Sequence, residues 1–486
     1  MTGIRAASSQ TTDKMSFTID KQTQEDLNLL GKFKKNSIIN LFNRTCTRKG
    51  ELLLERMFLL PLTDPNEINK RSRIIQYFQR LHTQFPVPPA LYGHVLSYLE
   101  SSPGSRLGII AGTISRKISF LTIGDTRYEA TCKGIASLME VLGIVEEFVM
   151  KIDEPGSPYR EPIDEIKGLY DKKISKLLKK TARSRLSFFR TLYYDSLFRY
   201  TYRRQLDRLI QVMSEIDLYI SVSDVAREKK LSYATALPGE HHATRIEGLF
   251  HPSLTSPVTN SVSIERDKNV IFLTGANMAG KSTFMKSYGI AVYLGHMGFP
   301  VPAAQMTFSV LEGMYTSINL PDNLSLGYSH FYAEVLRVKQ AAREVGSSKD
   351  MLVIFDELFK GTNVKDAFDA TVAVTRAFGK WDNCQFIIST HIVEAGEMLR
   401  DNGNMQFLYL PTRLEHNRPV YTYKIEQGIS GDRHGMRIIR NERIVETIMN
   451  TAGMESFPAH KSVKNREENN AKTGPGDKQG IIQPRR

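Results

Sequence analysis

A glycine-rich turn between a strand-like run and a helix-compatible run limits the possible folds of this chain more than any other stretch does. Residues 275–282 read GANMAGKS, which fits the pattern G-x-x-x-x-G-K-[ST]; NVIFLT (269–274) precedes it and FMKSYGIAVYLG (284–295) follows. Strand, loop and helix in this order are the context in which such a loop holds phosphate on its backbone N–H groups. The lysine supplies a cation, and the hydroxyl at the helix N-terminus can ligate Mg²⁺. The stretch predicts that ATP and Mg²⁺ bind here.

The residues assigned to the nucleotide form one continuous loop and helix start. Ser282 is also assigned to the metal. The alternative is a chance match to the pattern. The assigned positions are Gly275, Ala276, Asn277, Met278, Ala279, Gly280, Lys281, Ser282 and Thr283.

Two further strand-like runs end in groups suited to hydrolysis. MLVIFDE (351–357) ends in Asp356 and Glu357, and QFIIST (385–390) is followed by His391. A carboxylate at the tip of a buried strand is costly unless it faces a cation, so Asp356 is predicted to bind the metal. Glu357 is predicted to orient or deprotonate the attacking water, and His391 to sense or polarise the γ-phosphate. The alternatives are a surface Asp-Glu pair and a structural histidine.

The periodicity of apolar residues changes along the chain. Residues 16–235 are predicted to be helical, and 236–453 to form a parallel sheet covered by helices. Residues 1–15 and 454–486 are polar and predicted to be disordered. The loop DEPGSPYREP (153–162) is predicted to be a tip where the chain reverses. One long helix is predicted from a stripe spaced by three and four, formed by Leu206, Leu209, Ile210, Met213, Ile216 and Ile220.

Composition narrows the class of protein. Lys and Arg outnumber Asp and Glu by 65 to 52, a formal charge of +13, which makes a polyanionic partner plausible. Three widely separated cysteines suggest neither a disulfide framework nor a zinc site. Since the sequence contains no apolar run of 18 residues and no leader pattern, we expect a soluble cytoplasmic protein without membrane partners.

A basic segment is the second candidate binding feature. Residues 172–208 contain twelve Lys or Arg and two Asp, with aromatic residues interleaved. Such a segment can follow a phosphate backbone while its aromatics pack or stack on bases, so nucleic acid is the predicted partner. With about six phosphate contacts, affinity would fall roughly 10³-fold between 50 and 200 mM salt. The alternative is a solvated helix face whose aromatics belong to the core.

Taken together, the motifs resemble those of the MutS family, the ABC-type ATPases of DNA mismatch repair. GANMAGKST resembles the family's GPNMGGKST, and DELFKGTN (356–363) resembles its DELGRGTS. DNLSLGYSHFYAE (322–334) resembles the family segment that replaces the LSGGQ of other ABC ATPases. Residues 37–71 and 214–239 resemble the family's core and lever segments. The resemblance extends over roughly residues 16–450.

The resemblance implies a multidomain fold, an all-α core and lever domain followed by an α/β ABC-type P-loop ATPase domain. It also implies that Ser329 contacts the γ-phosphate held by a second subunit, and that residues 428–452 help to close a homodimer. The chain begins almost at the core domain, and the clamp region looks shortened. It is therefore identified as a short member without the family's N-terminal mismatch-recognition and connector domains.

The predicted function is a dimeric, Mg-dependent ATPase that couples ATP binding and hydrolysis to an arm holding double-stranded or branched DNA. Its expected location is the cytoplasm, on the nucleoid. The main alternative is a MutS-like sensor of branched DNA, RNA or ribosomes outside mismatch repair. An ATPase serving a membrane transporter is disfavoured because the sequence has no LSGGQ and no spanning segment. A scaffold with an inactive site is disfavoured because all the catalytic groups are present.

Overall fold

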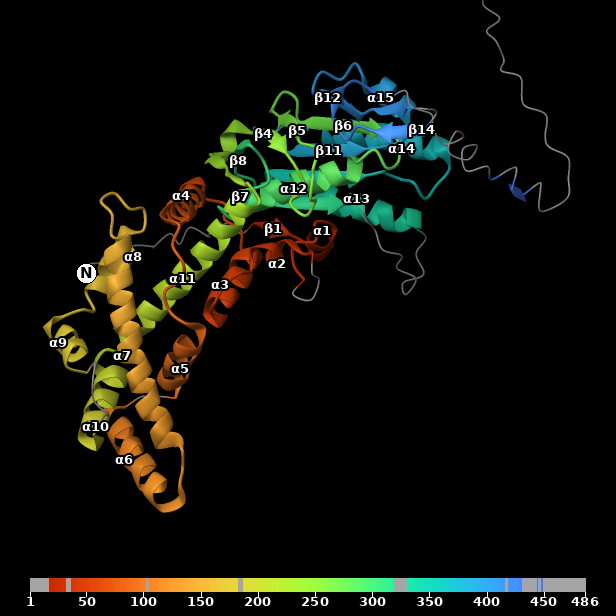
Figure 1. Cartoon of the computed structure of the whole chain (residues 1–486). Helices are drawn as coiled ribbons and strands as arrows, with labels where there is room; N and C mark the ends of the chain where they lie inside the picture. Colours follow the sequence, from red (N-terminus) through yellow and green to blue (C-terminus); the bar gives the residue numbers. More distant parts are fainter. Residues whose placement is uncertain are drawn as a thin grey trace, which may run out of the picture. The chain divides into compact units, whose positions relative to one another are not determined.

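The computed structural model describes residues 17–31, 36–101, 105–181, 187–318, 330–415 and 418–430, together with 444, 447 and 448. Residues up to Asp432 form one compact unit, and the last three described positions belong to a second, Arg433–Arg486. In the first unit helices predominate up to Glu228, and strands alternate with helices beyond it (Figure 1). The predicted order of a helical region followed by an α/β region is confirmed.

Amphipathic helices build the first half. None of the helices in the described ranges is both long and apolar enough to cross a membrane. Helix α7 (Arg127–Ile152) and helix α8 (Arg160–Lys167) are separated by a gap, which confirms that the helices break within 153–162, although α8 already begins inside that stretch. The bounds are α1 (Lys21–Asp26), α2 (Ile38–Phe42), α3 (Arg48–Leu59), α4 (Pro65–Leu81), α5 (Pro89–Glu100), α6 (Arg106–Ile123), α7 (Arg127–Ile152), α8 (Arg160–Lys167), α9 (Lys172–Thr181), α10 (Phe188–Ser196), the π-helix η1 (Leu197–Thr201) and α11 (Arg203–Glu228).

The long helix α11 is the scaffold of this half. All six residues of its predicted stripe are buried. In its middle, Asp217 Oδ1 accepts a hydrogen bond from Cys46 N at 2.8 Å. Asp217 Oδ2 accepts from Thr47 N at 2.8 Å and from Thr47 Oγ at 2.6 Å. This carboxylate therefore fastens the loop before α3 to α11.

A seven-stranded sheet forms the centre of the second half, in the order β1-β9-β10-β11-β6-β12-β15. The five central strands run parallel, and their residues are almost all buried, as expected for a sheet covered on both faces. The strands are β1 (Thr18–Ile19), β9 (Gly313–Ser317), β10 (Met351–Asp356), β11 (Gln385–Ser389), β6 (Val270–Gly275), β12 (Met405–Leu410) and β15 (Glu426–Gln427).

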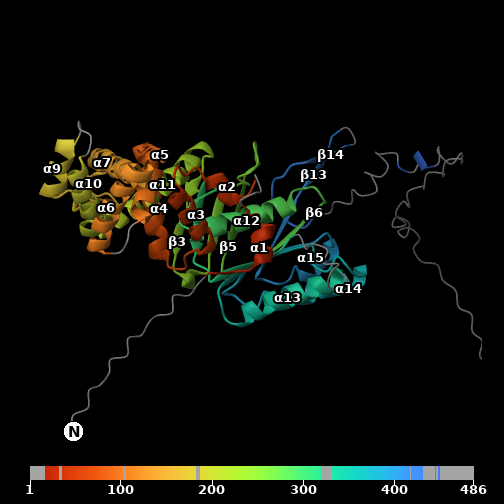
Figure 2. The same ribbon diagram turned by 90° about the horizontal axis from the view of Figure 1, so that it is seen from below.

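The two faces of this sheet pack against different helices, because successive residues of a strand point to opposite sides. Ile271 and Leu273 share a core with α12, whereas Val270 and Phe272 pack with α13, α14 and α15. Figure 2 shows α12 beside α2 and α3, on the helical side of the molecule. The helices are α12 (Lys281–His296), α13 (His330–Gly346), α14 (Val364–Phe378) and α15 (Val393–Leu399).

Smaller sheets flank the central one. A four-stranded sheet has the order β3-β8-β4-β5, and two pairs, β2-β7 and β13-β14, complete the strands of the described residues. A short 3₁₀ turn, η2 (Gly239–His241), follows β3. The strands are β2 (Ser232–Tyr233), β3 (Thr235–Leu237), β4 (Thr244–Leu249), β5 (Asn260–Ile264), β7 (Pro300–Val301), β8 (Gln305–Ser309), β13 (Thr412–Glu415) and β14 (Arg418–Tyr421).

The first described residues belong with the sheet. β1 pairs in parallel with β9, and the Asp26 carboxylate accepts hydrogen bonds from Thr316 Oγ at 2.8 Å and Ile318 N at 2.9 Å. Asp20 forms an ion pair with Arg337 of α13. The division at residues 235 and 236 stays a prediction, and to it the structure adds this contact between the chain's start and the sheet edge. The predicted disordered stretches 1–15 and 454–486 lie outside the described residues.

Buried His296 makes the fold sensitive to acid. Its Nδ1 lies 2.8 Å from Leu62 O, and its Nε2 accepts a hydrogen bond from Leu311 N at 3.2 Å, which requires the neutral ring. Burial lowers the pKa of His296 to about 4. Because an unfolded histidine titrates near 6.5, this contribution to stability is complete above that pH and is lost as pH falls toward 4. At about pH 5 the loss is about 2 kcal/mol. Urea unfolding near pH 7.5 and pH 5 measures it, and His296→Gln should show a smaller difference between the two.

Candidate nucleotide-binding site and basic segment

The glycine-rich loop follows β6 and leads into α12, as the sequence predicts. Gly275 ends the strand with φ +144°, and Gly280 precedes the helix with φ +104°. A side chain at Gly280 would stand 3.1 Å from Tyr423 Cδ1, and one at Gly275 would stand 3.2 Å from Leu410 O. Both positions therefore need glycine for conformation and for space. The loop lies at the carboxyl end of the parallel strands, where α/β sheets bind ligands.

The Lys281 side chain folds back against the carbonyl groups of the loop. Its Nζ donates to Gly275 O at 3.0 Å and to Ala276 O at 3.4 Å, and lies 3.9 Å from Glu357 Oε1. Only 5% of this side chain is exposed. A buried ammonium held by carbonyl oxygens and one carboxylate is placed to exchange these partners for phosphate oxygens.

Asp356 and Ser282 meet although they are 74 positions apart in the chain. The Ser282 hydroxyl donates to Asp356 Oδ2, and the Ser389 hydroxyl at the end of β11 donates to Asp356 Oδ1. One carboxylate and one hydroxyl therefore lie together beside a phosphate-binding type of loop. Both groups are hard oxygen ligands, which Mg²⁺ prefers. These residues fit the metal that the motif implies.

Glu357 is held in an unusual backbone conformation. Its φ is +56°, rare for a residue with a side chain, and its N–H donates to Ser389 O at 3.1 Å. The side chain is 24% exposed and faces Lys281. A small cavity of about 10 Å³ lies against Asp356 and Glu357, close to the space that one water molecule needs. The strained turn aims Glu357 into the site.

The other predicted residues are placed less directly. His391 is exposed after β11, and no hydrogen bond or ion pair joins it to Asp356, Glu357 or Lys281 within the described chain. Met278 is 77% exposed with φ +71°, whereas Ala279 is buried. Asn277 and Thr283 are exposed. Ser329 lies outside the described residues, as do most of residues 428–452.

A cavity of about 350 Å³ adjoins the loop and was not identified as a site from the sequence. Phe250 and Tyr423 line it together with Gly280 and Thr283. Burial lowers the pKa of His251 on its wall, so this ring is neutral at pH 7. Asn260 accepts a hydrogen bond from Ile425 N at 2.8 Å and donates to Tyr423 O at 3.0 Å, which fixes the outer wall. The local signals in the sequence are HPSL (251–254) and the region of Asn260, both of which resemble elements of the family, whereas no motif surrounds Tyr423.

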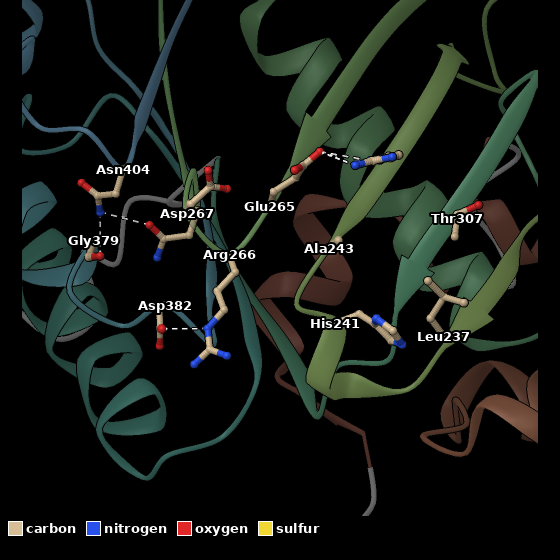
Figure 3. A pocket seen from close by; sticks show the side chains of 12 residues that line it. Leu237, His241, Ala243, Glu265, Arg266, Asp267, Thr307, Gly379, Asp382 and Asn404 are labelled. Atoms are coloured by element: carbon tan, nitrogen blue, oxygen red, sulfur yellow. Dashed lines mark hydrogen bonds and ion pairs between the residues drawn. The ribbon is translucent and has the colours of Figure 1, made fainter.

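A larger cavity, of about 790 Å³, lies at the opposite, amino end of the strands (Figure 3). Both arginines on its wall already have partners: Arg266 Nε lies 2.8 Å from Asp382, and Arg245 Nη2 lies 2.8 Å from Glu265. Asn404 Nδ2 donates to Gly379 O at 2.7 Å. The paired arginines leave little to attract an anionic ligand such as a nucleotide, so the size of a cavity alone does not identify the nucleotide site.

The basic segment is less uniform than its composition suggests. Arg199 is buried with Asp195, Arg203 pairs with Asp207 at 2.8 Å, and Arg208 pairs with Glu165 at 2.6 Å. Phe198 and Tyr202 are buried, which agrees in part with the alternative of a core face, whereas Phe189, Tyr193 and Tyr200 are at least half exposed. The exposed cations whose side chains are described are Lys172, Lys173, Lys176, Arg190 and Arg204.

Comparison with known proteins agrees with this architecture. A model of MutS domain III matches residues 22–90, and one of MutS domain V matches residues 271–456. The chain is 25% identical over 257 residues to the DNA mismatch repair protein MutS of Listeria monocytogenes serotype 4a, covering 52% of this chain and 29% of the relative. The corresponding protein of Desulfitobacterium hafniense is 29% identical over 252 residues, or 50% and 29%. That of Staphylococcus haemolyticus is 23% identical over 276 residues, or 55% and 31%.

The matched part thus spans about three-tenths of the length of these relatives. The two domain models together cover more than half of this chain and follow the same order as its helical and α/β regions. The chain belongs to the MutS family.

Proposed function

We propose that this chain is an ABC-type P-loop ATPase that binds Mg-ATP on residues 275–283 and hydrolyses it. The observation that carries the proposal is the meeting of Ser282, Lys281, Asp356 and Glu357 at the carboxyl ends of β6 and β10. Membership of the MutS family, with a match to domain V over this region, supports it.

Each residue has a distinct part in this proposal. Ser282 and Asp356 would hold Mg²⁺, which neutralises charge on the phosphates when bound. Lys281 would leave the loop carbonyls for phosphate oxygens, and the loop N–H groups would bind others. Glu357 would take the proton of the attacking water, with His391 near the γ-phosphate. The adenine would occupy the cavity beside Phe250 and Tyr423, which is large enough for a base and apolar on its walls.

We propose further that two copies of the chain form the working enzyme. The segment 322–334 resembles the family element that reaches across a dimer, and Ser329 would contact the γ-phosphate of the second subunit. The relatives are named DNA mismatch repair proteins, so nucleic acid held by the helical arm is the proposed partner. Nucleotide state would then control how firmly the arm holds it.

The ATPase rate measured with different nucleic acids tests this function. Perfect duplex, mismatched duplex, branched DNA and structured RNA are each added to the same enzyme preparation, with Lys281→Ala as a control for contaminating ATPase. We expect branched or mismatched DNA to raise the rate several-fold. A rate that no nucleic acid alters would contradict the coupling, and stimulation by RNA alone would favour the alternative outside mismatch repair.

Nucleic-acid binding should depend on salt less steeply than composition alone suggests. If about three exposed cations of the basic segment contact phosphates, affinity falls roughly 40-fold between 50 and 200 mM salt. Fluorescence anisotropy with a labelled duplex measures the slope. Lys176→Ala should reduce that slope by about 1, the contribution of one phosphate contact. Arg208→Ala should leave the slope nearly unchanged, because the charge of Arg208 is paired with Glu165. A flat response to salt would exclude this binding mode.

A further inference from the structure

A further cavity, of about 450 Å³, lies among α5, α6, α7 and η1, on elements that contribute nothing to the nucleotide loop. The described residues that line it include no carboxylate. Hydroxyl groups of Ser101 and Thr131 add polar atoms to its wall. Its charged lining residues are Arg116, Arg127, Lys133 and Arg199.

Arg199 forms the floor of this cavity, and its side chain is 1% exposed. It belongs to η1, and π-helical turns often occur at functional sites. Its Nη2 donates to Ser101 Oγ at 2.9 Å, and its guanidinium lies 4.1 Å from the centre of the Tyr98 ring. Nε is 3.2 Å from Asp195 Oδ1, but neither Nε nor Nη1 has a hydrogen-bond partner among the described atoms.

Asp195 compensates Arg199 only in part, because the same carboxylate serves two other donors. Tyr98 OH donates to Asp195 Oδ1 at 2.8 Å, and the Thr113 hydroxyl donates to Oδ2. A buried guanidinium with unused N–H groups is costly unless further negative charge is available. The floor of the cavity is therefore short of acceptors.

The cations on the walls of the cavity also have fewer acceptors than they could use. Arg116 is half-buried and makes one long hydrogen bond, to Thr131 Oγ at 3.4 Å. Neither Arg116 nor the exposed Lys133 has an ion pair within the described ranges. Of these three wall cations, Arg127 alone forms one, with Asp125 at 2.5 Å. The larger cavity at the sheet differs, since both arginines on its wall are paired with carboxylates (Figure 3).

We propose that this cavity of the helical region binds a phosphate group. Guanidinium groups in a fixed arrangement are well suited to phosphate oxygens, and the volume accommodates a ligand up to the size of a nucleotide. The phosphate could be that of a small free compound or that of a nucleic-acid strand. None of its residues belongs to the loop or to the carboxylates at β10, so the site is separate from the proposed ATPase site. Where the phosphate is that of a nucleic-acid strand, the inference rests on the proposed binding of nucleic acid by the helical arm, because Arg199 lies within residues 172–208.

Protection of Lys133 from acetylation tests the proposal. The full chain is treated briefly with acetic anhydride, and modification of each lysine is measured by mass spectrometry with and without inorganic pyrophosphate. We expect pyrophosphate to slow modification of Lys133 at least five-fold in the wild-type chain and to leave Lys151, exposed at the other end of α7, unchanged. Arg116→Ala should weaken the protecting effect of pyrophosphate about ten-fold or more.

Lys117→Ala is the matched control, because it removes the same charge from the next position of α6, where Lys117 faces Phe120 and Tyr128. Oligonucleotides with a 5′-phosphate and with a 5′-hydroxyl identify the source: protection by both indicates backbone phosphates, by the first alone a strand end, and by pyrophosphate alone a small compound. Unchanged Lys133 modification with every probe would overturn the proposal. Protection that persists in Arg116→Ala, or that extends equally to Lys151, would overturn it too.

Discussion

Replacing Glu357 by glutamine is expected to lower ATP turnover about 10³-fold while ATP still binds. The substitution keeps the size of the side chain and its reach toward the small cavity beside Asp356, but removes the group that accepts the proton. It also removes the negative charge 3.9 Å from Lys281 Nζ, so affinity for the triphosphate should stay level or rise. Steady-state phosphate release gives the turnover, and a fluorescent ATP analogue gives the affinity.

Glu397→Gln is the control for this experiment. Glu397 is half exposed on α15, where it pairs with Arg400 at 3.0 Å, and it is hydrogen-bonded to none of the described residues of the nucleotide site. Its turnover should match that of the wild-type chain. Turnover within two-fold of wild type in Glu357→Gln would show that another group accepts the proton.

Replacing Asp217 by alanine should lower the free energy of unfolding by about 3–5 kcal/mol. The carboxylate accepts three hydrogen bonds from Cys46 and Thr47, and its removal leaves the two Thr47 donors buried without partners. It also opens the space between α11 and Gly50, where an added Cβ would stand 2.5 Å from Asp217 Oδ2. Urea unfolding followed by far-UV circular dichroism measures the change.

Asp224→Ala is the comparison on the same helix. Asp224 pairs with Arg227 at the surface, where both side chains are 41% exposed, so the cost should stay below about 1 kcal/mol. If the two variants were equally stable, the link between α11 and the start of α3 would not be the one described.

The nucleotide loop could be predicted from the sequence because its determinants are local. Gly275, Gly280 and Lys281 lie within seven positions, and their geometry follows from that order. Asp356 could be predicted because the five apolar residues before it, 351–355, indicate a buried strand. The stripe of α11 was found because burial on one side of a helix leaves a period near 3.6.

Other features depend on contacts that no local pattern encodes. β1 consists of Thr18 and Ile19 alone, too short for a period, and pairs with residues almost 300 positions away. Tyr423 reaches the loop only through the fold of the last strands. Arg199 looked like one more cation for a phosphate backbone, because nothing in its neighbourhood shows that η1 turns it inward against Asp195. Charge can be counted in a sequence, but exposure cannot.

The unbroken course of α11 has a mechanical consequence. Its 26 residues form a rod about 39 Å long. Three residues separate its end at Glu228 from β2, which pairs with β7 after α12. Side-chain burial along the rod resists bending, so a small rotation at its foot is magnified at the far end. A tilt of about 5° would shift the residues next to η1 by about 3 Å. A shift of that size is enough to make or break a hydrogen bond. A sub-ångström displacement of the foot of α11 beside α12 would therefore alter the contacts of Arg199 at the other end.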